Sequence, residues 1–452
     1  MGTANLALML WIPLSVVISG YLRSPQAIFL VVFLGGSLLL PERMHLTLPG
    51  APPLDKHVIS AVAAWVALSI SGRGILSAPP RAKGGRVLLL WFFVSAVCTW
   101  LNNVDTLTYG TLVLPGHSFR EAVWSTSVSL LRIVLPYSLA QRVFKTPAEI
   151  RTLLKGFVVA GLLYTPLIFL EARIAPILHQ KVYGYFQHDW SQSLRGDGFR
   201  AFVFMSHGLA VAFFVSQALI AVSGLRKAGG ITFPFNLKWA SWILTAVLIS
   251  CKSLGAMLFA GVSVPMILYT SARAQSRLAS LLAGAVIMYP LARLYGWIPT
   301  DWLIEQALKA SADRAGSLEF RFINEDVLLT KALERKWFGW GWWARNRVYD
   351  VNGSDTTVTD GEWVIHLGQG GAFKFLIVFG LLLLPIWKTG RSLRKCQSDA
   401  DARALTTCAL LLAVAGVDLI PNASSNGFAY VVAGALSGTC TWLLRPPKQK
   451  LV

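Results

Sequence analysis

A short stretch in the last third of the chain holds the side chains best suited to acid–base chemistry. It runs from Thr359 to Gly371 and places Asp360, Glu362 and His366 just before a long apolar segment. A histidine beside carboxylates can act as a general base at neutral pH. The simpler alternative is a histidine that only borders a helix at the membrane surface. We take His366, Asp360 and Glu362 as candidate catalytic residues.

Arginines in two other stretches could hold phosphate. Arg195 and Arg200 flank a Gly-Asp-Gly sequence, and Arg321 lies in a polar segment further on. Guanidinium groups bind phosphate oxygens in a bidentate way, and glycines let a ligand approach the backbone. Arg321 also has a purely structural interpretation, because Glu325 stands four residues later and such helical ion pairs are common and weak.

Two further features have both structural and functional interpretations. Arg132 lies near the middle of an apolar run, where a charge is costly and is usually paired or lines a cavity. Asp418, in a later apolar run, is a candidate partner. The tryptophan-rich segment 337–343 could stack on sugar rings or anchor a loop at the lipid headgroups, and we favour anchoring.

The composition sets the class of protein that must position these residues. Of the 452 residues, 54% are hydrophobic and 14% are charged, against roughly 25% charged in an average soluble domain. We therefore expect an all-α polytopic membrane protein. The net charge of +19 does not indicate a nucleic-acid partner, because the basic residues form short clusters between apolar runs. The five cysteines show no CxxC spacing, and we expect no metal site and no cofactor.

A helix that spans a bilayer needs about 20 mostly apolar residues. Candidate spans are 4–21, 25–40, 57–72, 87–101, 121–141, 153–172, 201–223, 237–251, 254–270, 278–295, 371–387, 403–420 and 426–444. We expect 12–13 transmembrane helices in three parts. These are transmembrane helices in 1–294, one large loop in 295–370 with helices at Asp301–Ala312 and Ser317–Lys336, and C-terminal transmembrane helices in 371–452.

The Lys and Arg residues predict the orientation. Most of them lie in or beside alternate connectors, which should face the cytoplasm. Those connectors are 22–24, 73–86, 142–152, 224–236, 271–277, 388–402 and the C-terminal tail. The segments 173–200 and 295–370 then face outward, and the N-terminus does too.

In order and spacing, these features resemble the superfamily of O-antigen ligases and polymerases, the Wzy/WaaL-type membrane glycosyltransferases. Arg195 and Arg200 precede a span, and Ser250-Cys-Lys-Ser-Leu-Gly-Ala256 joins two others, where the family often has Ser-Arg-Gly. The long loop contains Ser317, Arg321 and Phe338-Gly339-Trp340-Gly341, and it closes with His366, Gly368 and Gly371. The match covers mainly residues 180–390.

The resemblance implies a GT-C-like fold in a bacterial inner membrane, with the catalytic loop in the periplasm. It implies an inverting, metal-independent transfer of glycan from an undecaprenyl-diphosphate-linked donor to a glycan acceptor. Arg195, Arg200, Arg321 and Lys252 would bind the diphosphate, and His366 would act on the acceptor hydroxyl. Because the residue after His366 is Leu, where the ligases commonly have Asn or Ser, Asp360 or Glu362 is an alternative base. Chain-length regulators or export proteins are further expected partners.

We prefer a polysaccharide polymerase, since nothing in the sequence singles out a lipid A acceptor. An O-antigen ligase that transfers glycan to a lipid A core or another acceptor is the alternative within the family. A transporter or flippase of lipid-linked sugars is the alternative of another class, and a purely structural membrane protein is a third. The long polar segment favours an enzyme, and we find none of the paired repeats that are typical of transporters.

Overall fold

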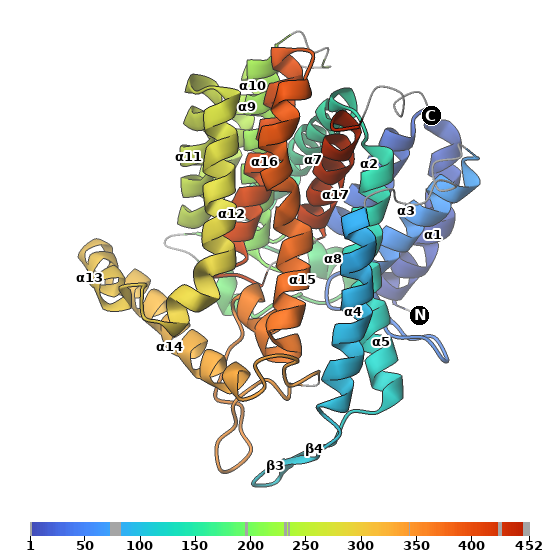
Figure 1. Cartoon of the computed structure of the whole chain (residues 1–452). Coiled ribbons are helices and arrows are strands. Elements are labelled where there is room, and N and C mark those ends of the chain that lie inside the picture. The colour runs from blue at the N-terminus through green and yellow to red at the C-terminus, as the bar shows by residue number, and fades with distance from the viewer. Residues whose placement is uncertain are drawn as a thin grey trace.

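The chain folds into a bundle of helices with two small β-hairpins (Figure 1). The computed structural model describes residues 2–72, 83–194, 198–229, 233, 236–342, 344–423 and 427–445. Among these residues, seven helical segments are long and apolar enough to cross a membrane. The prediction of an all-α polytopic membrane protein is confirmed at this level.

Helices coincide with all thirteen predicted spans. The seven long segments are α1 (Thr3–Tyr21), Phe119–Val143, α7 (Pro147–Arg173), α9 (Gly208–Ala228), α12 (Ala272–Leu294), Glu362–Lys395 and α16 (Asp399–Asp418). The shorter apolar helices are α2 (Pro25–Leu39), α3 (Lys56–Ile70), α4 (Lys83–Leu101), α10 (Leu237–Ser250), α11 (Leu254–Tyr269) and α17 (Phe428–Leu443). The segment Phe119–Val143 comprises α5 (Phe119–Ser129), a π-helical turn (Leu130–Val134) and α6 (Leu135–Val143).

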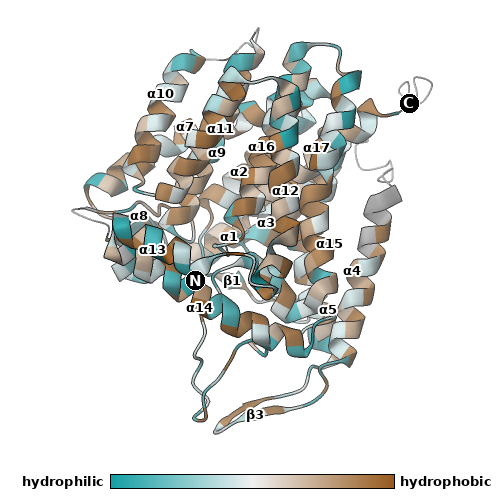
Figure 2. Ribbon diagram, turned by 60° about the vertical axis from the view of Figure 1, so that its left-hand side comes forward, coloured by the Kyte–Doolittle hydropathy of each residue, from teal (hydrophilic) through white to brown (hydrophobic). Residues whose placement is uncertain are grey.

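The centre of the bundle is apolar and closely packed. Most residues of α9 and α16 are buried. These two helices pack on each other and on α7, and α16 also packs on α12 and α17. Large apolar side chains also lie on the outer surface, for example Trp239, Trp242 and Leu281. A soluble protein rarely leaves so much apolar area exposed. The apolar colouring of the bundle in Figure 2 fits an outer surface that contacts lipid.

The predicted long polar segment lies at one end of the bundle. It forms α13 (Thr300–Ala310) and α14 (Ala312–Glu334), near the expected bounds. The hairpin β3–β4 (Leu107–Tyr109 and Leu112–Leu114) projects at the same end (Figures 1 and 2). A second hairpin, β1–β2 (His45–Leu46 and Leu54–Asp55), joins α2 to α3, and the short helix α8 (Leu178–Tyr183) follows α7.

Two helix boundaries differ from the prediction in places that matter for the site. Helix α9 begins at Gly208, so residues 201–207, expected to be helical, are irregular backbone. Helix α15 (Glu362–Ser392) begins inside the predicted loop and continues across a kink at Gly371, where φ is 66°. His366 therefore lies in a helix that enters the bundle, whereas the sequence placed it in the loop before a span.

Candidate functional site

Basic side chains from four separate segments act electrostatically on His207, which lies directly before α9. The nearest of these with a measured distance is His188, whose ring centroid lies 4.7 Å from that of His207. Burial and the neighbouring basic groups lower the pKa of His207 to about 3. The basic groups that act on it are His188, Arg200, Arg321 and Arg43. We call this set, together with Lys252, the basic cluster. The cluster includes Arg200 and Arg321, which the sequence analysis proposed separately. It also includes three residues that the sequence analysis did not single out, namely Arg43, His188 and His207.

Lys252 belongs to the basic cluster through its contacts with the segment that carries Arg200. A guanidinium nitrogen of Arg200 donates a hydrogen bond to the Lys252 carbonyl at 3.2 Å. A Cβ atom added to Gly198 would lie 2.8 Å from Lys252 Nζ, so the lysine side chain runs close over this glycine. The connector between α10 and α11 is therefore held against the loop that precedes α9. The fourth predicted phosphate ligand, Arg195, lies outside the described residues.

The irregular segment 200–207 is held rigidly inside the bundle. Glu171 Oε2 accepts hydrogen bonds from two of its backbone amides, at 2.9 and 2.6 Å. Gln187 Nε2 donates to two of its carbonyls, both at 3.1 Å, and Lys56 Nζ donates to a third at 2.8 Å. Buried backbone amides and carbonyls require such internal partners. The segment thus places Arg200 and His207 before any ligand arrives.

Unusual backbone geometry is concentrated around the basic cluster. Among the described residues other than glycine, four have a positive φ, and three of these belong to segments that build the cluster. They are Arg43 at 56°, Val203 at 51° and Lys252 at 50°. Such conformations cost on the order of 1–3 kcal/mol each and occur preferentially at functional sites. The surrounding contacts therefore hold these residues in positions that the chain alone disfavours.

The stem of Arg200 lies directly over Gly208. A Cβ atom at Gly208 would overlap Cγ and Cδ of Arg200. Arg200 itself is only 5% exposed, so it has little freedom to move aside. The absence of a side chain at Gly208 is thus what allows Arg200 to reach the cluster.

Arg321 contributes to the cluster from α14 and also contacts a predicted catalytic residue. Its Nε lies 3.6 Å from Asp360 Oδ2. The alternative ion pair with Glu325 does not form, because Glu325 is engaged by residues of α12. Its carboxylate accepts a hydrogen bond from Tyr289 at 2.9 Å and lies 3.3 Å from Arg293.

Those contacts fix α14 against α12. Arg293 also donates a hydrogen bond to Asp326 at 2.6 Å, and its guanidinium lies over the ring of Phe322. Glu325 is 6% exposed, and burial raises its pKa despite the nearby arginine. A carboxylate held in this way is a structural group. It orients α14 so that Arg321 faces the basic cluster.

Glu362 and His366 form a pair one turn apart in the first two turns of α15. Glu362 Oε1 lies 3.2 Å from His366 Nε2. The two groups are close, but neither imidazole nitrogen makes a well-aligned hydrogen bond within the described structure. The His366 side chain is 7% exposed and that of Glu362 is 14% exposed. The structure therefore brings two of the three predicted catalytic residues together, while Asp360 faces Arg321.

Arg132 has a partner other than the candidate Asp418. It forms an ion pair with Asp55, whose side chain also caps the start of α3. Asp418 instead accepts a hydrogen bond from Asn422 at 2.9 Å. The charge of Arg132 acts on Glu362, and Arg132 lies in the π-helical turn, a feature often found at functional sites.

The segment that contains Gly339 and Gly341 packs closely against the segment that contains Gly368 and Gly371. Gly371 and Gly339 each have a φ of 66°. A Cβ at Gly371 would overlap the backbone of Trp337, and one at Gly339 would lie 2.5 Å from the backbone of Gln369. The Gly341 amide donates to the Gln369 carbonyl at 2.8 Å. This close contact places the kink of α15, and hence the orientation of the Glu362–His366 pair.

The tryptophan-rich segment is mostly a packing element. Trp340 is 6% exposed, donates a hydrogen bond to the Lys331 carbonyl at 2.7 Å and lies under the ammonium of the same lysine. The expected role as a membrane anchor does not fit Trp340. Trp337 is 56% exposed and remains available for that role, while Trp343 lies outside the described residues.

No protein-family model matches the chain, and no curated protein matches it.

The arrangement combines two kinds of chemistry. The basic cluster offers several fixed positive charges, which suit a phosphate-bearing ligand. The Glu362–His366 pair offers a group that can take a proton. The basic cluster and the Glu362–His366 pair are connected through Asp360. This residue contacts Arg321 of the cluster and stands two residues before Glu362.

Proposed function

We propose that this protein is a membrane glycosyltransferase that transfers a glycan from a polyprenyl-diphosphate carrier. The observation that carries the proposal is a set of three arginines, Arg43, Arg200 and Arg321, whose charges all act on His207. Arg321 also contacts Asp360, which stands two residues before the Glu362–His366 pair. A lipid diphosphate needs its charge neutralised when it leaves, and preorganised arginines can supply this. A bundle with an apolar outer surface suits a substrate whose prenyl chain stays in the lipid.

The proposed reaction is a single displacement with inversion at the anomeric carbon. The acceptor hydroxyl oxygen forms a bond to that carbon as the bond between the carbon and the diphosphate oxygen breaks. The Glu362–His366 pair takes the hydroxyl proton, and the basic cluster holds the departing diphosphate with its electron pair. A glycan hydroxyl is a weak acid, so a positioned base is needed to activate it.

We further propose the cellular setting and the product. The end of the bundle with α13 and α14 faces the periplasm of a bacterial inner membrane, as the distribution of Lys and Arg predicts. The preferred product is a longer lipid-linked glycan, and the overall architecture is then of the GT-C-like kind. Donor, acceptor and any chain-length regulator or export protein would meet at this end.

The test uses the purified full-length chain in lipid nanodiscs with an undecaprenyl-diphosphate-linked oligosaccharide. Mass spectrometry should detect free undecaprenyl diphosphate and a lengthened glycan in equal amounts. Arg321→Ala should lose both products, and Lys309→Ala, which removes an exposed lysine from α13, should keep them. Binding of the donor without either product would overturn the proposal and favour a transporter.

A further inference from the structure

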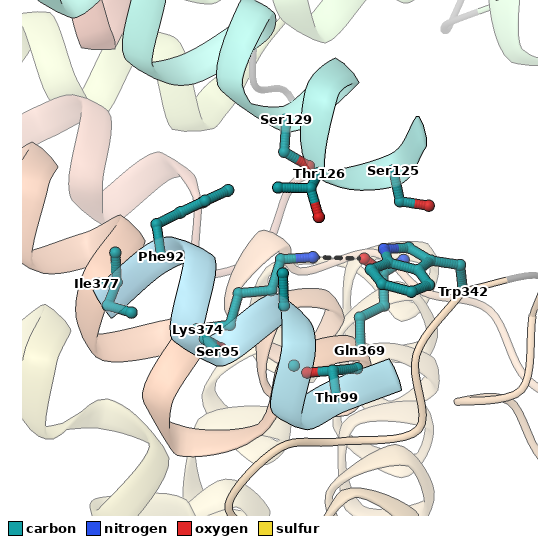
Figure 3. A pocket seen from close by; sticks show the side chains of 12 residues that line it. Phe92, Ser95, Thr99, Ser125, Thr126, Ser129, Trp342, Gln369, Lys374 and Ile377 are labelled. Carbon is teal, nitrogen blue, oxygen red and sulfur yellow. Dashed lines mark hydrogen bonds between the residues drawn. The ribbon is translucent and has the colours of Figure 1, made fainter. Parts of the chain in front are cut away.

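The pocket between α4, α5 and α15 is part of the packing of the bundle (Figure 3). The Lys374 side chain runs along it, and Nζ donates a hydrogen bond to Gln369 Oε1 at 3.0 Å. Its accessible wall is mostly apolar, and it has room for about one water molecule. A larger ligand does not fit there, whereas the outer surface of the bundle offers wide apolar areas.

That outer surface carries exposed aromatic side chains where the chain leaves α12. This helix has 23 residues, which gives a length of about 35 Å, and the core of a bilayer is about 30 Å thick. Tyr295 and Trp297 follow directly, and both are more than half exposed. Their rings stack with centroids 5.6 Å apart. Tyrosine and tryptophan are enriched where a span meets the lipid headgroups, so this pair marks one border of the membrane.

A second group of exposed aromatic side chains marks the other border. Tyr269 ends α11 just before α12 begins, and Trp239 and Trp242 lie in the first two turns of α10. Helices α10 and α11 run in opposite directions from their short connector, so these three residues lie at the same end of the bundle (Figure 1). The two aromatic groups therefore lie at opposite ends of α12.

Helix α13 lies at the height of the first border. It begins at Thr300, three residues after Trp297, and packs on α14. In Figures 1 and 2, α13 lies beside the lower part of the bundle, while the β3–β4 hairpin extends far below it. Figure 1 also shows that α13 projects sideways past α11 and α12. The surface that α14 leaves uncovered is thus level with the Tyr295–Trp297 pair.

The residue pattern of α13 is that of a helix that lies flat on a membrane. Its charged residues Asp301, Glu305 and Lys309 are spaced four apart and share one face. Ile304 and Leu308 are also four apart and lie on another face, where Leu308 is more than half exposed. A helix with a charged face and an apolar face lies in the plane of the interface, with the apolar face about 5–10 Å into the boundary between headgroups and acyl chains.

We propose that α13 and the Tyr295–Trp297 pair lie in the headgroup layer of the bilayer, with Leu308 directed toward the acyl chains. The partner of this surface is phospholipid. Because α13 packs on α14, the same contact fastens the helix that carries Arg321 to the membrane surface. The inference does not depend on glycan transfer.

The experiment places a fluorescent probe on each face of α13 in the full-length chain in phosphatidylcholine nanodiscs. Leu308→Cys and Lys309→Cys are a matched pair, because the two residues are adjacent and both are exposed. The background is Cys98→Ser with Cys396→Ser, since the other three cysteines are buried. Each variant is labelled with a thiol-reactive fluorophore, and its thermal unfolding is compared with that of the wild-type chain.

Phosphatidylcholine with a nitroxide on its acyl chain should quench the probe at position 308 at least about twofold more than the probe at position 309, because the apolar face lies deeper. Iodide in the aqueous phase should show the opposite order. Ile304→Cys and Glu305→Cys, one turn earlier, form a second pair that should give the same two orders.

Equal quenching of positions 308 and 309 by the lipid nitroxide would overturn the proposal. Strong quenching of position 308 by iodide alone would place this face in water and would overturn it too. Protection of position 308 from both quenchers would mean that a protein, such as a second copy of this chain, covers the face in place of lipid, and this result would also contradict the proposal.

Discussion

Arg321 Nε lies 3.6 Å from Asp360 Oδ2, and this contact connects the two halves of the candidate site. Arg321 comes from α14 and faces the basic cluster, whereas Asp360 leads into α15 and the Glu362–His366 pair. Both side chains are partly exposed, so the contact itself contributes little stability. Its importance is positional, because it shows that a charge-binding group and a proton-accepting pair share one region.

Removing Arg321 or Arg200 from the cluster should strongly slow transfer without unfolding the chain. Arg321→Ala and Arg200→Ala each remove one preorganised positive charge, and the loss of one such group typically lowers turnover about 10²–10³-fold. The rate of undecaprenyl diphosphate release measures the effect. Lys309→Ala is the matched control for loss of a charge on the same polar segment. If both arginine variants released undecaprenyl diphosphate at the wild-type rate, Arg200 and Arg321 would not be the diphosphate ligands.

Gly208→Ala should mimic the loss of Arg200 although it changes no charge. The new methyl group would occupy the space of the Arg200 stem, so the guanidinium must shift out of the cluster. We expect at least a tenfold drop in transfer, because small misplacements of binding groups are costly. Gly255→Ala on α11 is the control, since a Cβ there meets nothing within 4 Å. Equal rates for the two variants would contradict this arrangement.

The kink of α15 should not tolerate a side chain. At Gly371 the φ of 66° disfavours any other residue, and a Cβ would overlap the Trp337 backbone. Gly371→Ala should lower the free energy of unfolding by about 2 kcal/mol or more from the strained backbone and the forced shift. Thermal unfolding of the detergent-solubilised chain measures this. Gly380→Ala, further along the same helix, meets only one atom at 3.9 Å and should be close to neutral.

Acid should destabilise the protein through His207. Its pKa is about 3 in the folded chain, against about 6.5 for an unperturbed histidine. Between these values the unfolded chain binds the proton first, so the free energy of unfolding falls as the pH falls below about 6.5. Between pH 7.5 and pH 5, the free energy of unfolding should fall by about 1–2 kcal/mol less in His207→Gln than in the wild-type chain. If the free energy of unfolding changed with pH equally in the wild-type chain and in His207→Gln, His207 would not be the group responsible.

Glu362 and His366 should behave as one unit in catalysis. Glu362→Gln and His366→Gln should each reduce turnover about 10²–10⁴-fold, and the double variant should be little slower than either single one. Binding of the donor should change much less, because the pair is assigned to the acceptor proton. Multiplicative losses in the double variant would mean that the two residues act independently.

The sequence alone determined the class of the fold and the positions of its helices. Runs of apolar residues are a local property, and in a membrane a helix satisfies its own backbone hydrogen bonds. Each of the thirteen predicted spans therefore coincides with a helix. The polar segment and its two helices were predictable for the same local reason. The candidates Arg200, Arg321, Lys252, Glu362 and His366 came from residue type and from the family resemblance, and their roles stay predictions.

Only the tertiary structure decided which of these residues meet. Arg43 and Arg321 are nearly 280 residues apart, and no local pattern indicates that both would face His207. The candidate pairs Arg321–Glu325 and Arg132–Asp418 are replaced by Arg321–Asp360 and Arg132–Asp55, because packing between segments, rather than spacing along the chain, selects the partner. The kink of α15 likewise depends on a contact between Gly371 and the backbone of Trp337, which lies more than 30 residues earlier in the chain.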